Sequence, residues 1–323
     1  MITGKPYPIK GLIAYGCQIF HTLPNVARTK QALKNLDFYM AVDTLPQDHV
    51  AWADVVLPEA TYLERYDELW SCGHKTPYIT MREPAIDPLY QTKPAWWMVR
   101  ELGLRLGLDD FFTWKTAEEY LNRRLSSVGL NLDKLREQGG VVVQPGKAYL
   151  ADFEKENSSP FTTTSGKLEF YSDALEKSKL DPLPKYEATP EPPTGFFRLL
   201  YGRSPVHTFA RTQNTPVLNE LMPENEVWLN DEAAAKLGLK HGDRVMLENQ
   251  DGVKSGPIKV KATPRIRKDC VFMVHGFGHD APGMTRAHKK GASDAMLQSK
   301  YKLDPISGGA GLRINFVKLV REG

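Results

Sequence analysis

The chain has 323 residues, 41% of them hydrophobic and 25% charged, a composition that supports two ordinary buried cores and excludes disorder throughout. Its formal net charge of +3 suits an anionic small ligand but is too small to indicate nucleic acid by itself, and we expect no nucleic-acid partner. The sequence contains no apolar run of the ~18 residues needed to cross a bilayer, and its opening MITGKPYPIK lacks the apolar centre of a secretory signal, so it gives no sign of export.

Strands and helices alternate in the first part of the chain. Three apolar runs predict buried strands, at residues 11–16, 37–43 and 53–58, the first of them buried on both faces. Between them, residues 25–36 show a helical pattern with Asn25 as N-cap, and residues 45–52 predict a short helical turn. This β-α-β-α-β order implies a parallel sheet with right-handed crossovers. The residues after Pro58 predict the start of an acidic helix.

The middle of the chain is mainly helical and ends at a proline-rich stretch. Helical patterns cover residues 93–108 and 116–128, and residues 165–171 predict one further strand. Five prolines between Asp181 and Gly195 can neither pair in a sheet nor continue a helix. The sequence therefore predicts a partial α/β domain, a linker and a second domain, at residues 1–180, 181–195 and 196–323.

The second domain is rich in β-branched and aromatic residues. Six segments predict strands, at residues 196–202, 225–230, 243–249, 257–263, 270–276 and 312–320. One helix follows Asn230 as its N-cap and ends near Gly238. Six strands with a single helix are typical of a small closed barrel. The expected fold class is thus α/β, a partial parallel sheet followed by a six-stranded β-barrel.

The predicted parallel sheet is small for a domain of its own. Three strands that begin only ten residues into the chain leave edges and faces uncovered. We expect from this that the chain is a fragment, and that an N-terminal portion completes the sheet.

Ligands of open α/β sheets lie beyond the carboxyl ends of the strands. Three predicted loops qualify, at residues 16–22, 43–47 and 58–61. Pro58 ends the third strand, so Glu59 and Thr61 are expected in this crevice. Asp43 ends the second strand, where an acidic residue commonly bonds a ribose or a base; capping of the next turn explains it equally well. No GxGxxG follows the first strand, so a nicotinamide fingerprint is absent.

The second domain contains two further polar clusters. The stretch YGRSPVHTFARTQN carries groups that suit phosphates, although a solvated basic loop is an equal alternative, in Gly202, Arg203, His207, Arg211 and Thr212. In VHGFGHDAPG, His275 and His279 are four residues apart beside Asp280, but the glycines and proline argue against a helix that would present both rings to a metal. A glycine-rich strand exit that lets a ligand approach the backbone is favoured there. The glycines of DPISGGAG precede a strand, so they predict a tight turn and not a phosphate loop.

No complete catalytic apparatus is visible. The three cysteines, Cys17, Cys72 and Cys270, form no CxxC spacing, which argues against an all-protein iron–sulfur or structural zinc site. No nucleophile elbow, HExxH or Walker sequence occurs, and Glu64 with Asp67 fits a solvated helix face. The residues by themselves predict a chain that binds something anionic.

The ordered motifs ADVVLPEATYLER, TSGKLEFYS, GRSPVHTFARTQN, HGFGH, GASD and DPISGGAGLRINFV resemble the C-terminal half of molybdopterin oxidoreductase catalytic subunits, the dimethyl sulfoxide reductase superfamily. HTFARTQN and DPISGGAG look most like the polysulfide and thiosulfate reductase branch. The resemblance covers essentially the whole chain. It implies that the barrel is a double-psi barrel that binds molybdopterin guanine dinucleotide, two copies of which hold one molybdenum in the intact enzyme.

The resemblance also implies which residues contact this cofactor. The α/β loops would hold a guanosine end, and barrel loops the pterin and diphosphate, through Gly16, Asp43, Thr44, Gly202, Arg203, His207, Arg211, Thr212, His275, Gly276, Ser293 and Asp294. Many relatives have an Asn-x-Glu-Gly-Arg motif where this chain has SCGHKTPYI, so no contact is carried over to Cys72 or His74. The family's iron–sulfur cysteine motif and the segment bearing the metal's protein ligand are absent, and neither a metal ligand nor a catalytic residue is assigned here, Cys17 included.

The resemblance therefore predicts part of a molybdenum reductase that acts on polysulfide or thiosulfate. Its expected partners are the N-terminal portion of the catalytic subunit, which would carry the iron–sulfur cluster, an iron–sulfur electron-transfer subunit, a membrane anchor subunit and a small sulfur-compound substrate. The expected location is periplasmic, or the outer face of the cytoplasmic membrane. Two alternatives stay open: a stand-alone cofactor-binding module without its own activity, and an enzyme of the same superfamily with another substrate, such as arsenate, tetrathionate or formate.

Overall fold

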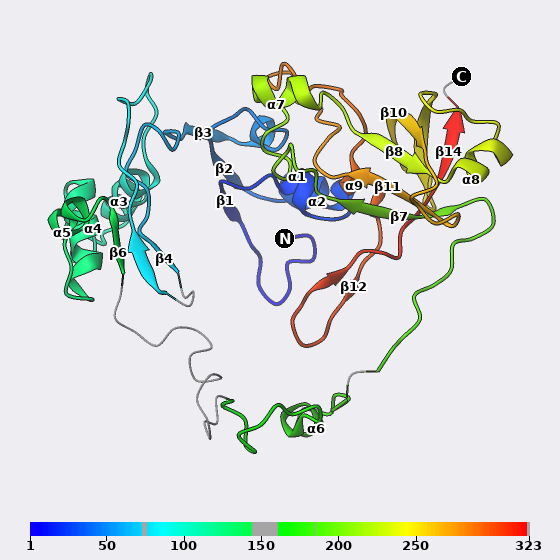
Figure 1. The fold of residues 1–323 in the computed structure, drawn as a ribbon. Helices are drawn as coiled ribbons and strands as arrows, with labels where there is room; N and C mark the ends of the chain where they lie inside the picture. The colour runs from blue at the N-terminus through cyan, green and yellow to red at the C-terminus, as the bar shows by residue number, and fades with distance from the viewer. Residues whose placement is uncertain (73–75, 144–160, 184, 322–323) are drawn as a thin grey trace. The chain divides into compact units, whose positions relative to one another are not determined.

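A computed structural model describes residues 1–72, 76–143, 161–183 and 185–321, so His74 lies outside the described residues. The chain forms two compact units, one of Met1–Pro58 with Ala188–Gly323 and one of Glu59–Glu187 (Figure 1). The domain boundaries expected from the sequence, at residues 1–180, 181–195 and 196–323, remain a prediction. The compact units are a different division of the chain, in which residues 1–58 pack with the barrel.

The first unit begins with the predicted parallel sheet. Strands β1 (Gly11–Tyr15), β2 (Phe38–Asp43) and β3 (Val55–Pro58) pair in parallel in that order (Figure 1). Between them lie α1 (Ile19–Thr22), α2 (Val26–Lys34) and the short 3₁₀ turn η1 (Val50–Trp52). The Asn25 side chain accepts a hydrogen bond from the backbone N–H of Arg28 at 3.1 Å, which confirms the expected N-cap of α2.

Burial on both faces, expected for β1, is wrong, and β3, expected to be a buried strand, is exposed as well. The central strand β2 is buried from Tyr39 to Val42, but Ile13 on β1 is 54% exposed and Val56 on β3 is 47% exposed. The residues Phe20, Val26 and Leu33 of the neighbouring helices form a core with Ala14 of β1 and Tyr39 of β2. The continuous apolar runs predicted burial because strands with such runs are usually buried on both faces in parallel sheets.

The predicted six-stranded closed barrel is confirmed. Its strands pair around the barrel in the order β10-β8-β11-β7-β14-β9. They are β7 (Phe197–Gly202), β8 (Glu226–Leu229), β9 (Arg244–Asn249), β10 (Lys254–Ala262), β11 (Cys270–Val274) and β14 (Phe316–Arg321). The pairs β8–β10 and β7–β11 are parallel and the other four are antiparallel. Alternate residues such as Val227, Leu229, Val245 and Leu247 fill the barrel interior.

Short elements connect the barrel strands. Helix α8 (Asp231–Lys236) has the predicted Asn230 N-cap and stops before Gly238, whose φ is +65°. Helices α7 (Pro216–Leu221) and α9 (Asp294–Leu297) lie in loops, and β12 (Lys302–Leu303) pairs with β13 (Ala310–Gly311) before β14. The glycine-rich segment is thus a turn that leads to a strand, as predicted.

Helix α9 joins the sheet to the barrel. Ala295 belongs to the same core as Phe20 and Leu33, and the backbone N–H of Asn25 donates to the carbonyl of Gln298 at 2.7 Å. These contacts explain why residues 1–58 are compact with the barrel.

The second unit contains an antiparallel sheet and helices. Strands β4 (Trp70–Cys72), β5 (Tyr78–Thr80) and β6 (Val141–Val143) form the sheet, and the helices are α3 (Ala95–Arg105), α4 (Ala117–Ser126), α5 (Leu132–Glu137) and α6 (Asp173–Lys177). Leu121, Leu125, Leu132 and Leu135 form its core with Val142. The helices α3 and α4 confirm two predictions. No helix of the described ranges is long and apolar enough to span a membrane.

Two local predictions in this unit are wrong. Residues 165–171 form no strand; Glu169 accepts hydrogen bonds from the backbone and hydroxyl of Ser165, and Phe170 is 77% exposed, because no described strand pairs with the segment. The residues after Pro58 form a turn and not a helix. Glu64 is buried there and accepts from the backbone N–H groups of Thr61 and Leu89, at 2.6 and 2.7 Å, which excludes the expected solvated helix face.

Candidate functional site

The loops after β1 and β2 lie at the carboxyl end of the parallel sheet. Gly16 has a φ of +58°, and a Cβ built on it meets no heavy atom within 4 Å, so open space lies before this turn. Asp43 is half-buried at the end of β2, and one carboxylate oxygen accepts from the backbone N–H groups of Thr44 and Leu45, at 2.7 and 3.2 Å. The turn-capping alternative for Asp43 is therefore present in the structure, while Thr44 itself is exposed.

Electrostatics distinguish Asp43 from an ordinary surface carboxylate. Burial raises the pKa of Asp43, although the backbone N–H groups of Leu45 and Thr44 and the charge of Arg211 oppose that shift. Burial also raises the pKa of the neighbouring Cys17 thiol, and the charge of Asp43 adds to the effect. Cys17 is thus a neutral thiol, not an activated thiolate.

Arg211 brings the barrel loop to this turn. Its guanidinium donates a hydrogen bond to the carbonyl oxygen of Gly16, 195 residues away in sequence. Arg211 is exposed, so its remaining donors face solvent beside Asp43. A guanidinium held by a backbone carbonyl at a sheet crevice is well placed to bind phosphate oxygens.

The rest of the loop after β7 contains two kinds of residue, those that make hydrogen bonds within the protein and cations that are exposed. His207 is buried; its Nδ1 lies 3.1 Å from the hydroxyl of Thr212 and its Nε2 lies 2.8 Å from the carbonyl of Met222. Thr212 also accepts from the backbone N–H of Thr208 at 2.9 Å. Because both ring nitrogens of His207 have partners inside the protein, His207 and Thr212 fix the loop from within.

Arg203 is exposed on the same loop. Its guanidinium lies 4.1 Å from the ring centre of Phe209, which holds it by a cation–π contact. With Lys261 and Arg265 it lines a pocket of about 480 Å³. Gly202 precedes it at the end of β7, where a Cβ would lie 2.9 Å from the ring of Phe272. Glu226 lines the same pocket and lies 3.4 Å from Lys261, so three cations face one carboxylate there and the net charge of the lining suits an anion.

The exit of β11 forms a histidine–aspartate pair. Nδ1 of His275 lies 2.9 Å from a carboxylate oxygen of Asp294, which is fully buried and also accepts from Gln298 at 2.7 Å. Burial alone would lower the pKa of His275, but the hydrogen bond and charge of Asp294 outweigh it and raise that pKa. Since Nδ1 is engaged, Nε2 is the nitrogen that can donate to an anionic ligand.

Glycine and serine residues bring the barrel loops close together. Gly276 has a φ of +95°, and a Cβ there would lie 2.3 Å from the carbonyl oxygen of Phe209. Ser293 caps α9 by accepting from the backbone N–H of Met296 at 3.3 Å, and its own N–H donates to Ser255. The structure therefore places His275, Gly276, Ser293 and Asp294 side by side and against the loop of Arg203.

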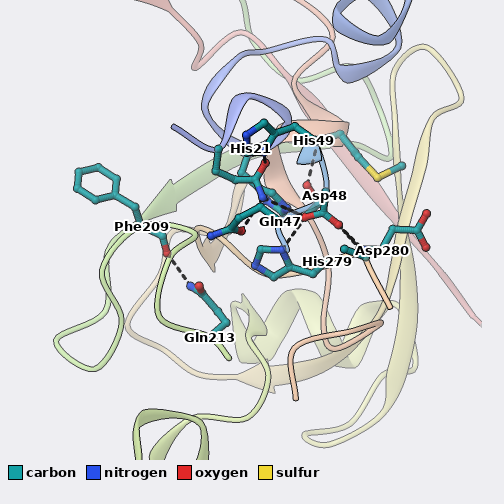
Figure 2. A network of polar contacts seen from close by, with 12 residues as sticks. His21, Gln47, Asp48, His49, Phe209, Gln213, His279 and Asp280 are labelled. Atoms are coloured by element: carbon teal, nitrogen blue, oxygen red, sulfur yellow. Dashed lines mark hydrogen bonds and ion pairs between the residues drawn. The ribbon is translucent and has the colours of Figure 1, made fainter. Parts of the chain in front are cut away.

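The sequence reading missed a buried polar cluster beneath these loops. Figure 2 shows the carboxylate of Asp48 between the rings of His21 and His279, at 3.2 and 2.6 Å. The side-chain amide of Gln18 links Asp48 to His49. Its nitrogen donates to Asp48 Oδ2, and its oxygen Oε1 lies 3.2 Å from Nδ1 of His49. The only sequence signal was a set of polar residues directly after two parallel strands. His275 and His279, considered together as metal ligands, instead face different carboxylates, Asp294 and Asp48.

Glu59 and Thr61, expected in the crevice, belong to the second unit. Glu59 is buried and paired with Arg65, and the backbone N–H of Thr61 donates to Glu64. Both residues therefore have local partners in that unit.

Comparisons with known proteins match both parts of the chain. Residues 3–105 match the family model "Molybdopterin oxidoreductase", and residues 197–315 match "Molydopterin dinucleotide binding domain". The thiosulfate reductase molybdopterin-containing subunit PhsA of Salmonella typhimurium is 31% identical over 95% of this chain and 43% of its own length. Dimethyl sulfoxide reductase DmsA of Escherichia coli is 28% identical over 97% of this chain and 42% of its length.

A solved structure agrees with this assignment. Acetylene hydratase from Pelobacter acetylenicus superimposes with a TM-score of 0.79 at 25% identity, over 99% of this chain and 45% of that chain. The chain thus spans less than half the length of the relatives it matches.

Proposed function

Because the chain belongs to the molybdopterin oxidoreductase family, we propose that it is the cofactor-holding part of a molybdenum catalytic subunit. Its loops would bind molybdopterin guanine dinucleotide, two copies per molybdenum in the intact enzyme. The observation that carries the proposal is the contact of Arg211 with Gly16, which joins the barrel to the carboxyl end of the parallel sheet. When bound, the molybdenum cofactor supplies the two-electron redox chemistry.

The residues present fit a dinucleotide. Each diphosphate linkage carries about two negative charges, and Arg203, Arg211 and His275 offer cationic donors on adjoining loops. Gly16 offers an uncovered turn and Asp43 a half-buried carboxylate for the guanosine end. We assign the pterin and the diphosphate to the loops of the barrel. Gly276, Ser293 and Asp294 would lie on the barrel side of the bound cofactor. Gly202, His207 and Thr212 shape the same loop, and Thr44 lies at the guanosine side.

For the reaction, we propose the reduction of thiosulfate or polysulfide. The support is the 31% identity to the thiosulfate reductase subunit, above the 26% and 28% of the acetylene hydratase of Syntrophotalea acetylenica and of DmsA. The names of these relatives show that one fold serves several reactions, and the proposal of a sulfur substrate therefore follows the relative with the highest identity of the three. We further propose that the rest of the catalytic subunit carries the iron–sulfur cluster and the metal's protein ligand. An iron–sulfur subunit and a membrane anchor would complete a complex outside the cytoplasmic membrane.

The first prediction concerns nucleotide content. The chain is produced in a host that makes the cofactor, and mass spectrometry measures the guanine nucleotide and molybdenum that co-purify with it. We expect nucleotide with the wild type, and dissociation about 10-fold or more faster for Arg211→Ala, because a charge-assisted hydrogen-bond donor is lost.

Arg267→Ala is the matched control. Arg267 is an exposed arginine that pairs with Asp269 at the other end of β11, so it removes the same charge far along the strand from His275. Equal nucleotide retention in all three proteins, or none in any, contradicts the proposal. Nucleotide without molybdenum favours a stand-alone binding module.

A further inference from the structure

Asp48 is the most heavily hydrogen-bonded carboxylate of the candidate site. Its Oδ2 lies 2.6 Å from His279 Nδ1 and 3.2 Å from both His21 Nε2 and Gln18 Nε2 (Figure 2). Its Oδ1 accepts from the backbone N–H groups of Asp280 and Ala281, at 2.6 and 2.7 Å. The side chain is only 9% exposed. A buried carboxylate with five donors is a strong structural link, since each bond is charge-assisted.

These donors come from loops that are distant in sequence. Gln18 and His21 follow β1, Asp48 itself follows β2, and His279 with Asp280 follows β11 of the barrel. The same three loops carry Gly16, Asp43 and His275. One side chain therefore ties together the three segments that the proposed function assigns to the two ends of the dinucleotide.

We propose that Asp48 is a positioning residue that holds the loops after β1, β2 and β11 in the arrangement that binds the dinucleotide. This inference rests on the proposed function. Asp48 does not itself contact the cofactor; it acts through the loops that do. A rigid link beneath a binding site lowers the cost of ordering its loops when the ligand binds.

The link consists of hydrogen bonds and not of a metal centre. His21, Asp48 and His279 offer ligand atoms that all lie within 4.8 Å of one another, close enough for one metal ion to bind all three. A metal-bound histidine, however, usually donates its other ring N–H to an acceptor. His21 Nδ1 and His279 Nε2 are buried with no partner in the described structure, and the Gln18 amide nitrogen lies against the same oxygen. Since a carboxylate only accepts, the ring nitrogens that face Asp48 carry the protons.

The test is hydrogen–deuterium exchange of the full chain with and without cofactor. In Asp48→Ala, we expect peptides of residues 16–22, 43–49 and 275–281 to exchange at least about 10-fold faster, with β8 and β9 unchanged. Asp48→Asn keeps one oxygen for the backbone donors and is expected to be intermediate. It also preserves the test if the alanine variant fails to fold. Asp280→Ala is the matched control, because its exposed side chain points away from the rings (Figure 2).

The second readout is the rate at which guanine nucleotide leaves the loaded chain. We expect faster release from Asp48→Ala by a similar factor and wild-type release from Asp280→Ala. Loops that exchange as in the wild type, a barrel that loosens together with them, or faster exchange with unchanged release each overturn the proposal. One equivalent of zinc or another divalent metal that co-purifies with the wild type and not with Asp48→Ala overturns it too.

The two proposals fail differently in this design. A chain that takes up no nucleotide in any form contradicts the proposed function. The exchange of the cofactor-free proteins then still decides whether Asp48 holds the three loops together.

Discussion

Four histidines of the first unit occupy three kinds of site. His207 braces its loop through both nitrogens, His275 is held by Asp294 with one nitrogen toward the ligand side, and His21 and His49 are buried beside Asp48 and Gln18. Burial lowers the pKa values of His21 and His49, whereas the hydrogen bond and charge of Asp294 raise the pKa of His275. The stability of the first unit is therefore expected to depend on pH through these side chains.

Acidification is expected to destabilise the first unit through His21 and His49. Burial lowers the pKa of His21 from its ordinary 6.5 and lowers the pKa of His49 to about 4. The unfolded chain binds protons on these rings below about pH 6.5, whereas the folded chain resists them, so stability is lost as pH falls from 6.5 toward 4. Thermal melting should give a lower Tm at pH 5 than at pH 7, and His49→Gln should reduce that difference.

His275 provides the opposite sign as an internal control. Its pKa is raised, so its contribution is fully present below about pH 6.5 and is lost as pH rises through the folded value. His275→Gln should therefore cost more stability at pH 6 than at pH 9. A wild-type Tm that is equal at pH 5 and pH 7, with no effect of His49→Gln, would show that the two rings are not held neutral.

At the residue scale, the sequence could indicate candidate residues but not their partners. Asp43 stood out because it ends a strand, yet only the structure shows that it caps its own turn. Asp48 lay in a predicted helical turn and carried only the weak signal of a polar residue after a strand, because three of its five donors, on residues 279–281, lie more than 200 residues away. Periodicity reports local structure, and such long-range hydrogen bonds leave no local pattern.

At the element scale, strand positions could be predicted well and burial less so. The barrel strands were predicted from their β-branched and aromatic residues, and in the structure the buried Val227, Leu229, Val245 and Leu247 alternate with less buried neighbours such as Trp228. The apolar residues of β1 and β3 carried no such alternation, and the structure leaves Ile13 exposed. Residues 165–171 have strand-forming side chains but no described pairing strand, and propensity without a partner does not make a sheet.

The contact between the β11 exit and the loop of Arg203 gives a prediction at this scale. Gly276→Ala places a Cβ against the carbonyl of Phe209 at a φ of +95°, so it should cost roughly 1–3 kcal/mol in the free energy of unfolding. Urea denaturation measures that cost. Gly16→Ala is the matched comparison, because its Cβ meets open space and only the left-handed backbone is penalised, by about 1 kcal/mol. Equal costs would refute the close approach of the two loops.

At the scale of the whole molecule, two differently built parts form one compact unit. The α/β sheet and the barrel are separated in sequence by the residues of the second unit, yet α9, Arg211 and Asp48 join them. The order of motifs indicated both parts, but the grouping of residues 1–58 with the barrel required the structure. Ile13 of β1 and Val56 of β3 are exposed in this unit, and the match to the thiosulfate reductase subunit PhsA covers 43% of the length of that protein.

The central claim is that loops of the sheet and the barrel converge on one pterin nucleotide, and a structure of the cofactor-loaded chain tests it most directly. We predict that phosphate oxygens lie within about 3 Å of the Arg211 guanidinium and of His275 Nε2, with the guanine ring beside Asp43. A nucleotide bound elsewhere, with Arg211, His275 and Asp43 all turned to bulk solvent, would contradict the account.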